Sequence, residues 1–436
     1  MSFWRGLLAA RSHLAFIAGL LLAFGVKRAV DHTLSRPPPI EELRAALPLR
    51  QPGPLTPAQE QVARDAWQYL VRNTRESGLV DSVEGFPSTT LWDQGSALMG
   101  MVAARELGLI DGAELDARAG KLLDALLRAP LVGDALPNRN YDTRTVLPVD
   151  SNGKPMPDGA GGWSALDLGR FGVPLSALLW RSPVLSPRVR ALLARWKLEQ
   201  ATRDGELLGG DLREGKLLRQ QEGRLGYEQY AAQSLALFGL DVSRARALQR
   251  HLKIIRAGGQ ELPDDDRAPA EHGGVRTPVL SEPWVLYGLE FGLDAEARPL
   301  AEAVFRAQEA RFQRTQILTA VSEDNLDRAP YFVWSTLFEG GVPFRVYDTE
   351  GREQPLLRTL STKAALGWAA LFEGSYAEAL EAAGEAARAE GKGLFSGRYE
   401  EDGSWNRAMS ANTCGIALEA LAYRVHGPLL RAARLP

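Results

Sequence analysis

Three short stretches of the sequence repeat one turn: Leu107-Gly108-Leu109-Ile110-Asp111, Phe238-Gly239-Leu240-Asp241 and Phe291-Gly292-Leu293-Asp294. In each stretch a glycine follows an apolar residue, a leucine comes next, and an aspartate follows within two residues. Glycine often ends a helix in the left-handed conformation, and aspartate is a favoured cap for the start of a helix. The stretches therefore predict tight connections between consecutive helices, and their recurrence predicts a repeated helical hairpin.

Segments with helical spacing of apolar residues lie on both sides of these turns. The sequence predicts helices at about 57–76, 88–108, 111–128, 163–181, 186–202, 226–239, 241–257, 281–291, 294–313, 329–339, 359–372, 375–391 and 410–425. Longer segments rich in Gly, Pro, Asp and aromatic residues separate the hairpins, at 77–87, 130–162, 203–225, 258–280, 314–328, 340–358 and 392–409.

Short turns at one end and long loops at the other end are typical of a ring of helical hairpins. We therefore expect an all-α fold, an (α/α)6 barrel, whose long-loop end carries the function. Small β hairpins are expected in the long loops, as at Phe344-Arg345-Val346-Tyr347. A stacked, open solenoid of hairpins is the structural alternative.

The N-terminal region predicts a membrane attachment. An apolar run from Leu14 to Val26 is flanked by basic residues, which indicates a signal anchor over residues 1–30, with the rest of the chain in the periplasm. A cleaved signal peptide and an amphipathic helix are the alternatives. Residues 31–56 contain Pro37-Pro38-Pro39 and predict a Pro-rich spacer, and Thr56-Pro57 predicts the start of the barrel domain, residues 57–436.

Composition excludes several classes of function. A net charge of −3 and the lack of a basic run interleaved with aromatic residues argue against a nucleic-acid partner. A single cysteine, Cys414, and five scattered histidines argue against a zinc site, so no metal and no cofactor is expected. Cys414 itself is interpreted as a buried helix residue.

Acidic residues recur beside aromatic residues at the starts of the predicted helices or in the loops before them. The pairs are Trp92 with Asp93, Trp163 with Asp167, Tyr227 with Glu228, Trp284 with Glu282, and Trp405 with Asp402, and Glu323 and Asp324 add two more acids. Aromatic rings offer apolar area to the C–H faces of a sugar, while carboxylates bind hydroxyl groups and supply general acids and bases. This pattern favours a carbohydrate ligand.

Other interpretations of these acids stay open. Asp93 could be the buried polar partner of a neighbouring helix, and Asp167 could pair with Arg170 on the surface. Glu282 could be present only because the helix dipole favours an acid in the first turn, and Glu323 with Asp324 could cap the next turn.

Four stretches together resemble a bacterial envelope family catalogued as domain of unknown function 3131. They are Pro87-Ser88-Thr89-Thr90-Leu91-Trp92-Asp93-Gln94-Gly95-Ser96, Leu136-Pro137-Asn138-Arg139-Asn140-Tyr141, Gly162-Trp163-Ser164-Ala165-Leu166-Asp167-Leu168-Gly169-Arg170 and Tyr227-Glu228-Gln229-Tyr230-Ala231-Ala232. The similarity runs from about Ala63 to Tyr423. It implies an (α/α)6 toroid akin to glucoamylase-like enzymes, a group that includes glycosidases that cleave β-1,2-glucan.

The leading hypothesis is a glycoside hydrolase or transglycosylase acting on an envelope or periplasmic glucan, with β-1,2-linked glucan as one candidate. Glu228 is predicted as the general acid, its pKa raised by apolar surroundings, and Glu282 as the base or nucleophile. The remaining predicted roles are substrate-binding: Asp93, Asp167 and Asp324 for hydroxyl groups, and Trp92, Trp163, Tyr227 and Trp284 for ring stacking. The rival hypothesis is a non-catalytic glycan-binding or scaffold protein of polysaccharide export.

Overall fold

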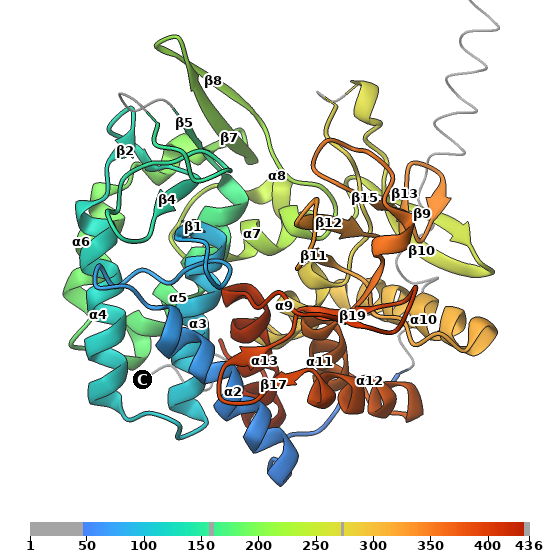
Figure 1. The fold of residues 1–436 in the computed structure, drawn as a ribbon. Helices are drawn as coiled ribbons and strands as arrows, with labels where there is room; N and C mark the ends of the chain where they lie inside the picture. Colours follow the sequence, from blue (N-terminus) through green and yellow to red (C-terminus); the bar gives the residue numbers. More distant parts are fainter. Residues whose placement is uncertain (1–46, 157–160, 272–273, 431–436) are drawn as a thin grey trace, which may run out of the picture.

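The computed structural model describes residues 47–156, 161–271 and 274–430. Within this part of the chain, α-helices alternate between an inner and an outer ring (Figure 1). The inner helices are α3 (Leu91–Glu106), α5 (Ala165–Arg181), α7 (Tyr227–Ala236), α9 (Glu282–Glu290), α11 (Thr362–Leu371) and α13 (Ala411–His426). The outer helices are α2 (Pro57–Asn73), α4 (Gly112–Arg128), α6 (Ser186–Arg195), α8 (Ser243–Arg246), α10 (Ala297–Thr315) and α12 (Ser375–Ala386).

The inner ring is closed. Each inner helix contacts the next one in chain order, and the last, α13, packs against the first, α3. Glycines permit this close packing: a Cβ atom on Gly169 of α5 would lie 2.5 Å from Ala231 of α7, and one on Gly415 of α13 would lie 2.4 Å from the Ser96 carbonyl oxygen of α3. The expected (α/α)6 barrel is confirmed, and the open solenoid is excluded.

Each of the first five inner helices runs from a long loop to a short turn that leads into an outer helix. Gly108, Gly239 and Gly292 adopt φ angles of +70°, +79° and +84°, as expected for helix-ending glycines. After the first of these turns the Asp111 side chain accepts a hydrogen bond from Glu114 N–H at 2.8 Å and caps α4. We call the end of the barrel with these turns the turn face, and the opposite end, where the inner helices begin, the loop face.

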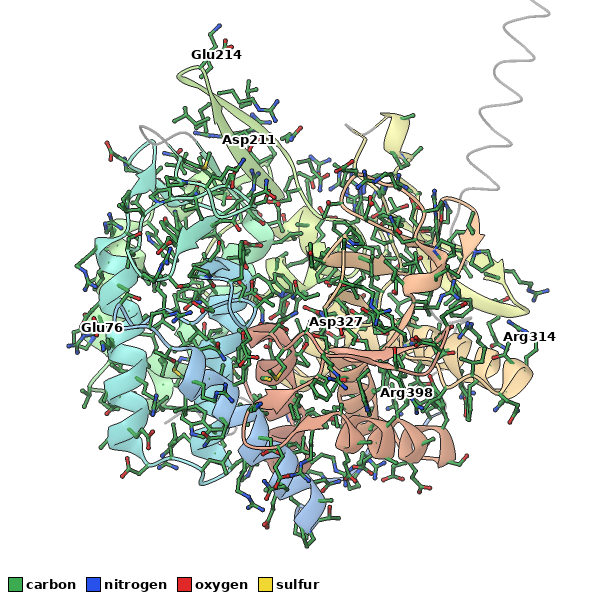
Figure 2. All side chains as sticks on the ribbon, in the orientation of Figure 1. Glu76, Asp211, Glu214, Arg314, Asp327 and Arg398 are labelled. Carbon is green, nitrogen blue, oxygen red and sulfur yellow. The ribbon has the colours of Figure 1, made fainter. Side chains whose placement is uncertain are left out.

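All β-strands of the described residues lie in the loops that lead into inner helices, so they line the loop face. The antiparallel pairs are β1 (Ser88–Thr90) with β4 (Asn140–Asp142), β2 (Leu131–Val132) with β3 (Leu136–Pro137), β9 (Leu252–Ala257) with β10 (Gln260–Asp265), β13 (Phe338–Glu339) with β14 (Val342–Pro343), and β17 (Arg388–Ala389) with β18 (Gly393–Leu394). The larger sheets are β11 (Glu323–Asn325), β12 (Phe332–Ser335) and β15 (Val346–Tyr347); β16 (Thr359–Ser361), β19 (Gly397–Tyr399) and β20 (Trp405–Asn406); and β5 (Gly161–Trp163), β6 (Thr202–Arg203) and β8 (Lys216–Gln221) around β7 (Glu206–Arg213). The β7–β8 hairpin projects from the body, with Asp211 along it and Glu214 at its tip (Figure 2).

Two predicted helices are wrong. In the range 241–257 only Ser243–Arg246 is helical, and Leu252–Ala257 forms β9, because Ile254 and Ile255 lead into a Gly258-Gly259 turn that folds the chain into a hairpin. In the range 329–339 the structure has β12 and β13, because residues 332–335 alternate between half-buried and buried, the period of a strand.

A buried ion cluster fills the axis of the barrel. Arg170 of α5 is fully buried, donates to Glu419 of α13 at 2.5 Å, and forms an ion pair with Glu290 of α9. It also donates to the Tyr230 hydroxyl of α7 at 3.0 Å and to the Ser96 hydroxyl of α3 at 3.2 Å. One side chain thus connects five of the six inner helices, and the predicted surface pair of Asp167 with Arg170 is wrong.

The described part of the predicted spacer, residues 47–56, packs against the barrel at the turn face. Arg50 N–H donates to the Leu371 carbonyl at 2.9 Å, and Gly53 N–H donates to the Arg424 carbonyl at 2.8 Å. These acceptors lie at the ends of α11 and α13. No helix of the described ranges is long and apolar enough to cross a bilayer, and the predicted anchor at 1–30 lies outside them.

Candidate active site at the loop face

The first turns of the inner helices bring most of the predicted site residues to the loop face. Trp92 and Asp93 lie on α3, Asp167 on α5, Tyr227 and Glu228 on α7, and Glu282 with Trp284 on α9, while Asp324 lies on β11 and Trp163 on β5. Serine and threonine start several of these helices: Thr90, Ser164 and Ser410 each accept a hydrogen bond from a backbone N–H of the first turn. Asp93 and Asp167 both follow such a cap by three residues.

Glu282 is held by donors from three other inner helices. Trp92 Nε1 of α3 donates to it at 3.0 Å, Asn412 Nδ2 of α13 donates at 3.0 Å, and Lys363 of α11 forms an ion pair with it. The Glu282 side chain is buried, as are Lys363 and Asn412. A carboxylate with three such donors is fixed in position.

Glu228 has a separate set of partners. Arg267 Nη2 donates to it at 2.6 Å and Gln221 Nε2 at 3.0 Å, and Arg267 is shared with Asp265. Burial raises the pKa of Glu228 to about 7 although the Arg267 charge opposes this shift, which matches the direction predicted for it. Its exposure of 1% leaves almost no carboxylate surface for a substrate. Because Glu228 and Glu282 share no partner among these contacts, their action as a pair stays a prediction.

A second pair of acids lies at the start of α5, and these acids are only half-buried. Glu222 accepts a hydrogen bond from Ala165 N–H at 2.5 Å, and Asp167 lies in the first turn of the same helix. Burial, with the neighbouring Glu222 charge, raises the pKa of Asp167 to about 7, and burial also raises the pKa of Glu222. A pKa of about 7 leaves Asp167 partly protonated at neutral pH, and the hydrogen bond from Ala165 N–H favours the ionised form of Glu222 against the effect of burial.

Asp93 is a half-buried acid with a mainly local set of bonds. Ser82 Oγ donates to its Oδ2 at 2.5 Å and Thr90 Oγ1 at 2.6 Å. Burial raises its pKa, and the hydroxyl bonds oppose this shift. The interpretation as a buried polar partner thus accounts for these bonds, while partial exposure leaves room for a ligand contact.

Asp324 and Glu323 lie on neighbouring positions of β11 and point to opposite faces of the sheet. Asp324 is buried and accepts from Thr359 and Ser361 hydroxyls, both at 3.0 Å, and burial raises its pKa to about 7. Glu323 is half-buried and accepts from the Tyr227 hydroxyl. Asp324 therefore supports the β11–β16 contact, and Glu323 is the acid of this strand that faces the site.

The four predicted aromatic residues divide into two groups. Trp92 and Tyr227 are half-buried and contact each other edge to face, with ring centroids 5.3 Å apart. Trp163 and Trp284 are buried, at 1% and 2% exposure, and the Trp163 Nε1 donates to the Leu208 carbonyl at 3.1 Å. Trp163 and Trp284 leave almost no ring surface for the predicted stacking on a sugar, because they belong to the core.

Three residues of the site escaped the sequence analysis. Lys363 and Asn412 hold Glu282, and Glu222 adjoins Asp167. A lysine at the start of an otherwise apolar helix, Thr362–Leu371, is the signal that could have identified Lys363, because a charge in such surroundings needs a partner.

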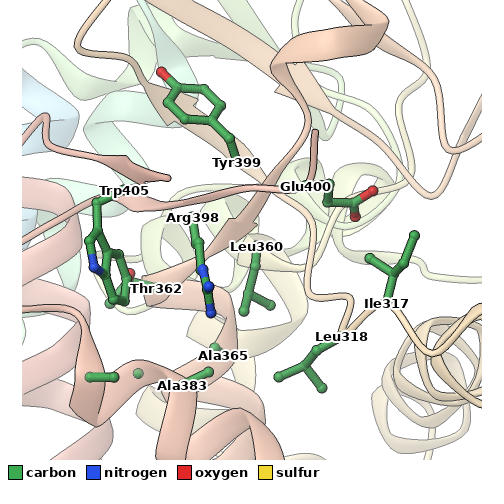
Figure 3. Close-up of a pocket in the computed structure, with 12 residues that line it drawn as sticks. Ile317, Leu318, Leu360, Thr362, Ala365, Ala383, Arg398, Tyr399, Glu400 and Trp405 are labelled. Carbon is green, nitrogen blue, oxygen red and sulfur yellow. The ribbon is translucent and has the colours of Figure 1, made fainter. Parts of the chain in front are cut away.

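A pocket of about 220 Å³ lies apart from these acids, between α11, α12 and the β16–β19–β20 sheet (Figure 3). Leu360, Arg398 and Trp405 surround it, and Ala365 and Ala383 form its floor. None of the predicted site residues lines this pocket, although Trp405 belongs to the acid–aromatic pair with Asp402.

A closed inner ring, strand-bearing loops on one face and a group of acids with tyrosine and tryptophan at the helix starts define an (α/α)6 barrel with a polar site at its loop face. The chain belongs to the family described as Protein of unknown function (DUF3131), whose model matches residues 61–427. A comparison with curated proteins gives no match.

Solved structures share the fold over most of the chain. An endo-β-1,2-glucanase from Chitinophaga pinensis, in complex with sophorotriose and glucose, is 13% identical with a TM-score of 0.60 over 86% of this chain and 94% of that chain. A candidate glucoamylase from Bacteroides fragilis is 12% identical with a TM-score of 0.59 over 87% and 95%. An endo-β-1,2-glucanase from Talaromyces funiculosus, in complex with sophorose, is 12% identical with a TM-score of 0.55 over 86% and 84%. At these identities the likeness is one of fold.

Proposed function

We propose that this protein is a glycoside hydrolase or transglycosylase that acts on a glucan, and that the glucan is a β-1,2-linked glucan of the bacterial envelope. The observation that carries the proposal is the pair of half-buried carboxyl groups at the start of α5, where Asp167 lies in the first turn and Glu222 accepts from Ala165 N–H. Burial and the Glu222 charge raise the pKa of Asp167 to about 7, which suits a general acid. The fold shared with two endo-β-1,2-glucanases supports the choice of substrate.

In this proposal Asp167 donates its proton to the glycosidic oxygen as the bond to the anomeric carbon breaks. Glu222, positioned by Ala165 N–H, takes a proton from the water that attacks the anomeric carbon, or from an acceptor sugar hydroxyl in transglycosylation. Trp92 and Tyr227 supply ring surface for the sugar, and Asp93 accepts hydroxyl hydrogen bonds. The sequence-based alternative is the pair of Glu228 as acid and Glu282 as base.

Substitution of single carboxyl groups distinguishes the two pairs. The protein from residue 47 onward is incubated with linear and cyclic glucans, and the products are read by chromatography. We expect Asp167→Asn and Glu222→Gln to lower kcat by about 10²–10⁴-fold with little change in glucan affinity. Asp402→Asn is the matched control, because Asp402 is an exposed acid of the β19–β20 turn that accepts from Ser404 N–H.

The pH dependence adds a second test. A general acid acts in its protonated form, so activity should fall as pH rises above about 7, the pKa of Asp167, and Asp167→Asn should abolish this limb of the profile. If Glu228→Gln and Glu282→Gln lost turnover while Asp167→Asn stayed fully active, Glu228 and Glu282 would be the catalytic pair, as the sequence predicted.

The burial and ion pairing of Glu228 and Glu282 favour a second candidate function, a non-catalytic glycan-binding or scaffold protein of polysaccharide export. In that case the wild-type protein binds glucan without forming product, and every carboxyl variant that folds keeps its binding. We also propose that residues 1–30 anchor the chain in the inner membrane and place the barrel domain in the periplasm.

A further inference from the structure

The outward face of the β11–β12 sheet continues the site beyond Glu323. Glu323 pairs directly with Trp334 across the two strands, and Asn325 pairs with Phe332. Directly opposed residues of antiparallel strands point to the same face. All four side chains are half-buried, whereas Asp324 and Val333, on the other face, are buried. The sheet therefore presents one partly accessible face made of two aromatic and two polar side chains.

Trp334 is fixed by aromatic neighbours on the same face of the sheet. Its ring stacks on Tyr347 of β15 with centroids 5.5 Å apart and an interplanar angle of 19°, and Arg276 lies over the same Tyr347 ring at 4.6 Å. Phe332 meets Trp334 edge to face at 4.9 Å. Tyr347 is the direct partner of Trp334 across β12 and β15, so it lies on the same face of the sheet and covers one side of the Trp334 ring. A rigid aromatic ring of this kind binds a flat ligand surface at low entropic cost.

This face adjoins the candidate active site through one residue. The Tyr227 hydroxyl donates to Glu323, and the Tyr227 ring contacts Trp92, whose chain neighbour is Asp93. Tyr227 begins α7, which lies in the inner ring between α5, with Asp167, and α9. Trp334 therefore adjoins Tyr227 through Glu323 of β11, while Asp167 lies on α5, the inner helix on the other side of α7 from α9.

We propose that Trp334, with Phe332 and Asn325, forms a binding subsite for one glucose ring of an extended glucan chain, separate from the ring that meets the α5 acids. The C–H face of the sugar lies on the Trp334 ring, and the Asn325 and Glu323 side chains bind its hydroxyl groups. This subsite deepens the proposed function and rests on it for the identity of the glycan. It makes the protein selective for longer chains, because a short oligosaccharide fills one side of Tyr227 only.

Calorimetric titration with β-1,2-linked gluco-oligosaccharides of two to seven units tests the subsite without depending on turnover. We expect the affinity of the wild-type protein to rise with chain length. Trp334→Ala should lower the affinity for the longest oligosaccharide about tenfold, the loss of roughly 1.4 kcal/mol of stacking, and leave the disaccharide unchanged. Trp334→Phe should recover most of the loss, because it restores a ring.

Trp405→Ala is the control, because Trp405 lines the pocket beside α11 and α12 and should leave both affinities unchanged. Near-ultraviolet dichroism identifies variants that fold. Long-chain affinity that is equal in Trp334→Ala and wild type would overturn the subsite while the proposed function stands. Failure of the wild-type protein to bind any of these glucans would overturn the glucan assignment and the subsite together.

Discussion

The buried ion cluster on the barrel axis predicts a large, pH-dependent loss of stability when its cation is removed. Arg170 is the one cation of this cluster, and Glu290 and Glu419 bind it from α9 and α13. Arg170→Met keeps an unbranched apolar chain of similar length in the space. It leaves the two carboxyl groups buried without their cation, and it removes a donor to the Tyr230 hydroxyl.

The magnitude follows from the burial of all three groups. Breaking a buried ion pair by removal of one partner costs about 3–5 kcal/mol. Burial raises the pKa of Glu290 well above its usual range, and the Arg170 charge opposes this shift. A carboxyl group with a raised pKa in the folded state contributes stability that is complete below its unfolded pKa and is lost as pH rises toward the folded pKa. Without the Arg170 charge, the ionised forms of the buried Glu290 and Glu419 side chains are less stable. The destabilisation should therefore be greatest at high pH, where the unfolded chain ionises both groups.

Urea unfolding at pH 5 and pH 8 measures the effect. We expect Arg170→Met to lower the free energy of unfolding by about 3–5 kcal/mol at pH 8, and by less at pH 5. The triple variant Arg170→Met, Glu290→Gln, Glu419→Gln should recover most of the loss and lack the pH dependence, because no buried charge remains. A loss below about 1 kcal/mol at pH 8, or a triple variant as unstable as the single one, would contradict this reasoning.

Three further predictions concern other parts of the chain. Lys363→Met should destabilise the protein, and adding Glu282→Gln should offset that loss. A double-mutant cycle of urea unfolding should give a coupling of about 1–3 kcal/mol between the two residues, and additive effects would argue against the ion pair. Proteins that start at residue 47 and at residue 54 should both be soluble, folded and mainly helical, but calorimetry should give the shorter one a lower Tm, because it lacks the hydrogen bonds of Arg50 and Gly53 to the turn face. An alkaline phosphatase domain fused after Pro436 should be active, and a fusion that works only with a cytoplasmic reporter would rule out the periplasmic location.

Local patterns in the sequence predicted the scaffold well. The helix-ending glycines and the apolar periodicity predicted most of the helices and their pairing into hairpins, since both act over a few neighbouring residues. The same reasoning failed at 252–257 and 332–335, where short apolar runs fit a strand as well as a helix. The second failure hid Trp334, because the face of a residue cannot be assigned while the period of its element is wrong.

The sequence predicted where most of the site residues lie, but it did not predict their hydrogen-bond and ion-pair partners. Asp93, Asp167, Tyr227 and Glu282 reach the loop face because each lies in the first turn of an inner helix. Their partners are set by the closure of the ring, which no local pattern encodes: Arg267 meets Glu228 from 39 residues away. Two of the predicted tryptophans, Trp163 and Trp284, are core residues. The sequence could not distinguish them from site residues, because a tryptophan beside an acid carries no information about which side of the helix or strand is covered.

The position of Arg170 also determines how a polymer can approach. With five inner helices bonded to one side chain, the barrel has no lumen along its axis, so a polysaccharide cannot thread through the ring and leave from the turn face. A chain that binds at the loop face must therefore enter and leave on that same face. For an enzyme with this geometry, the products must leave through the opening by which the substrate enters, so product release and substrate binding compete for the loop face.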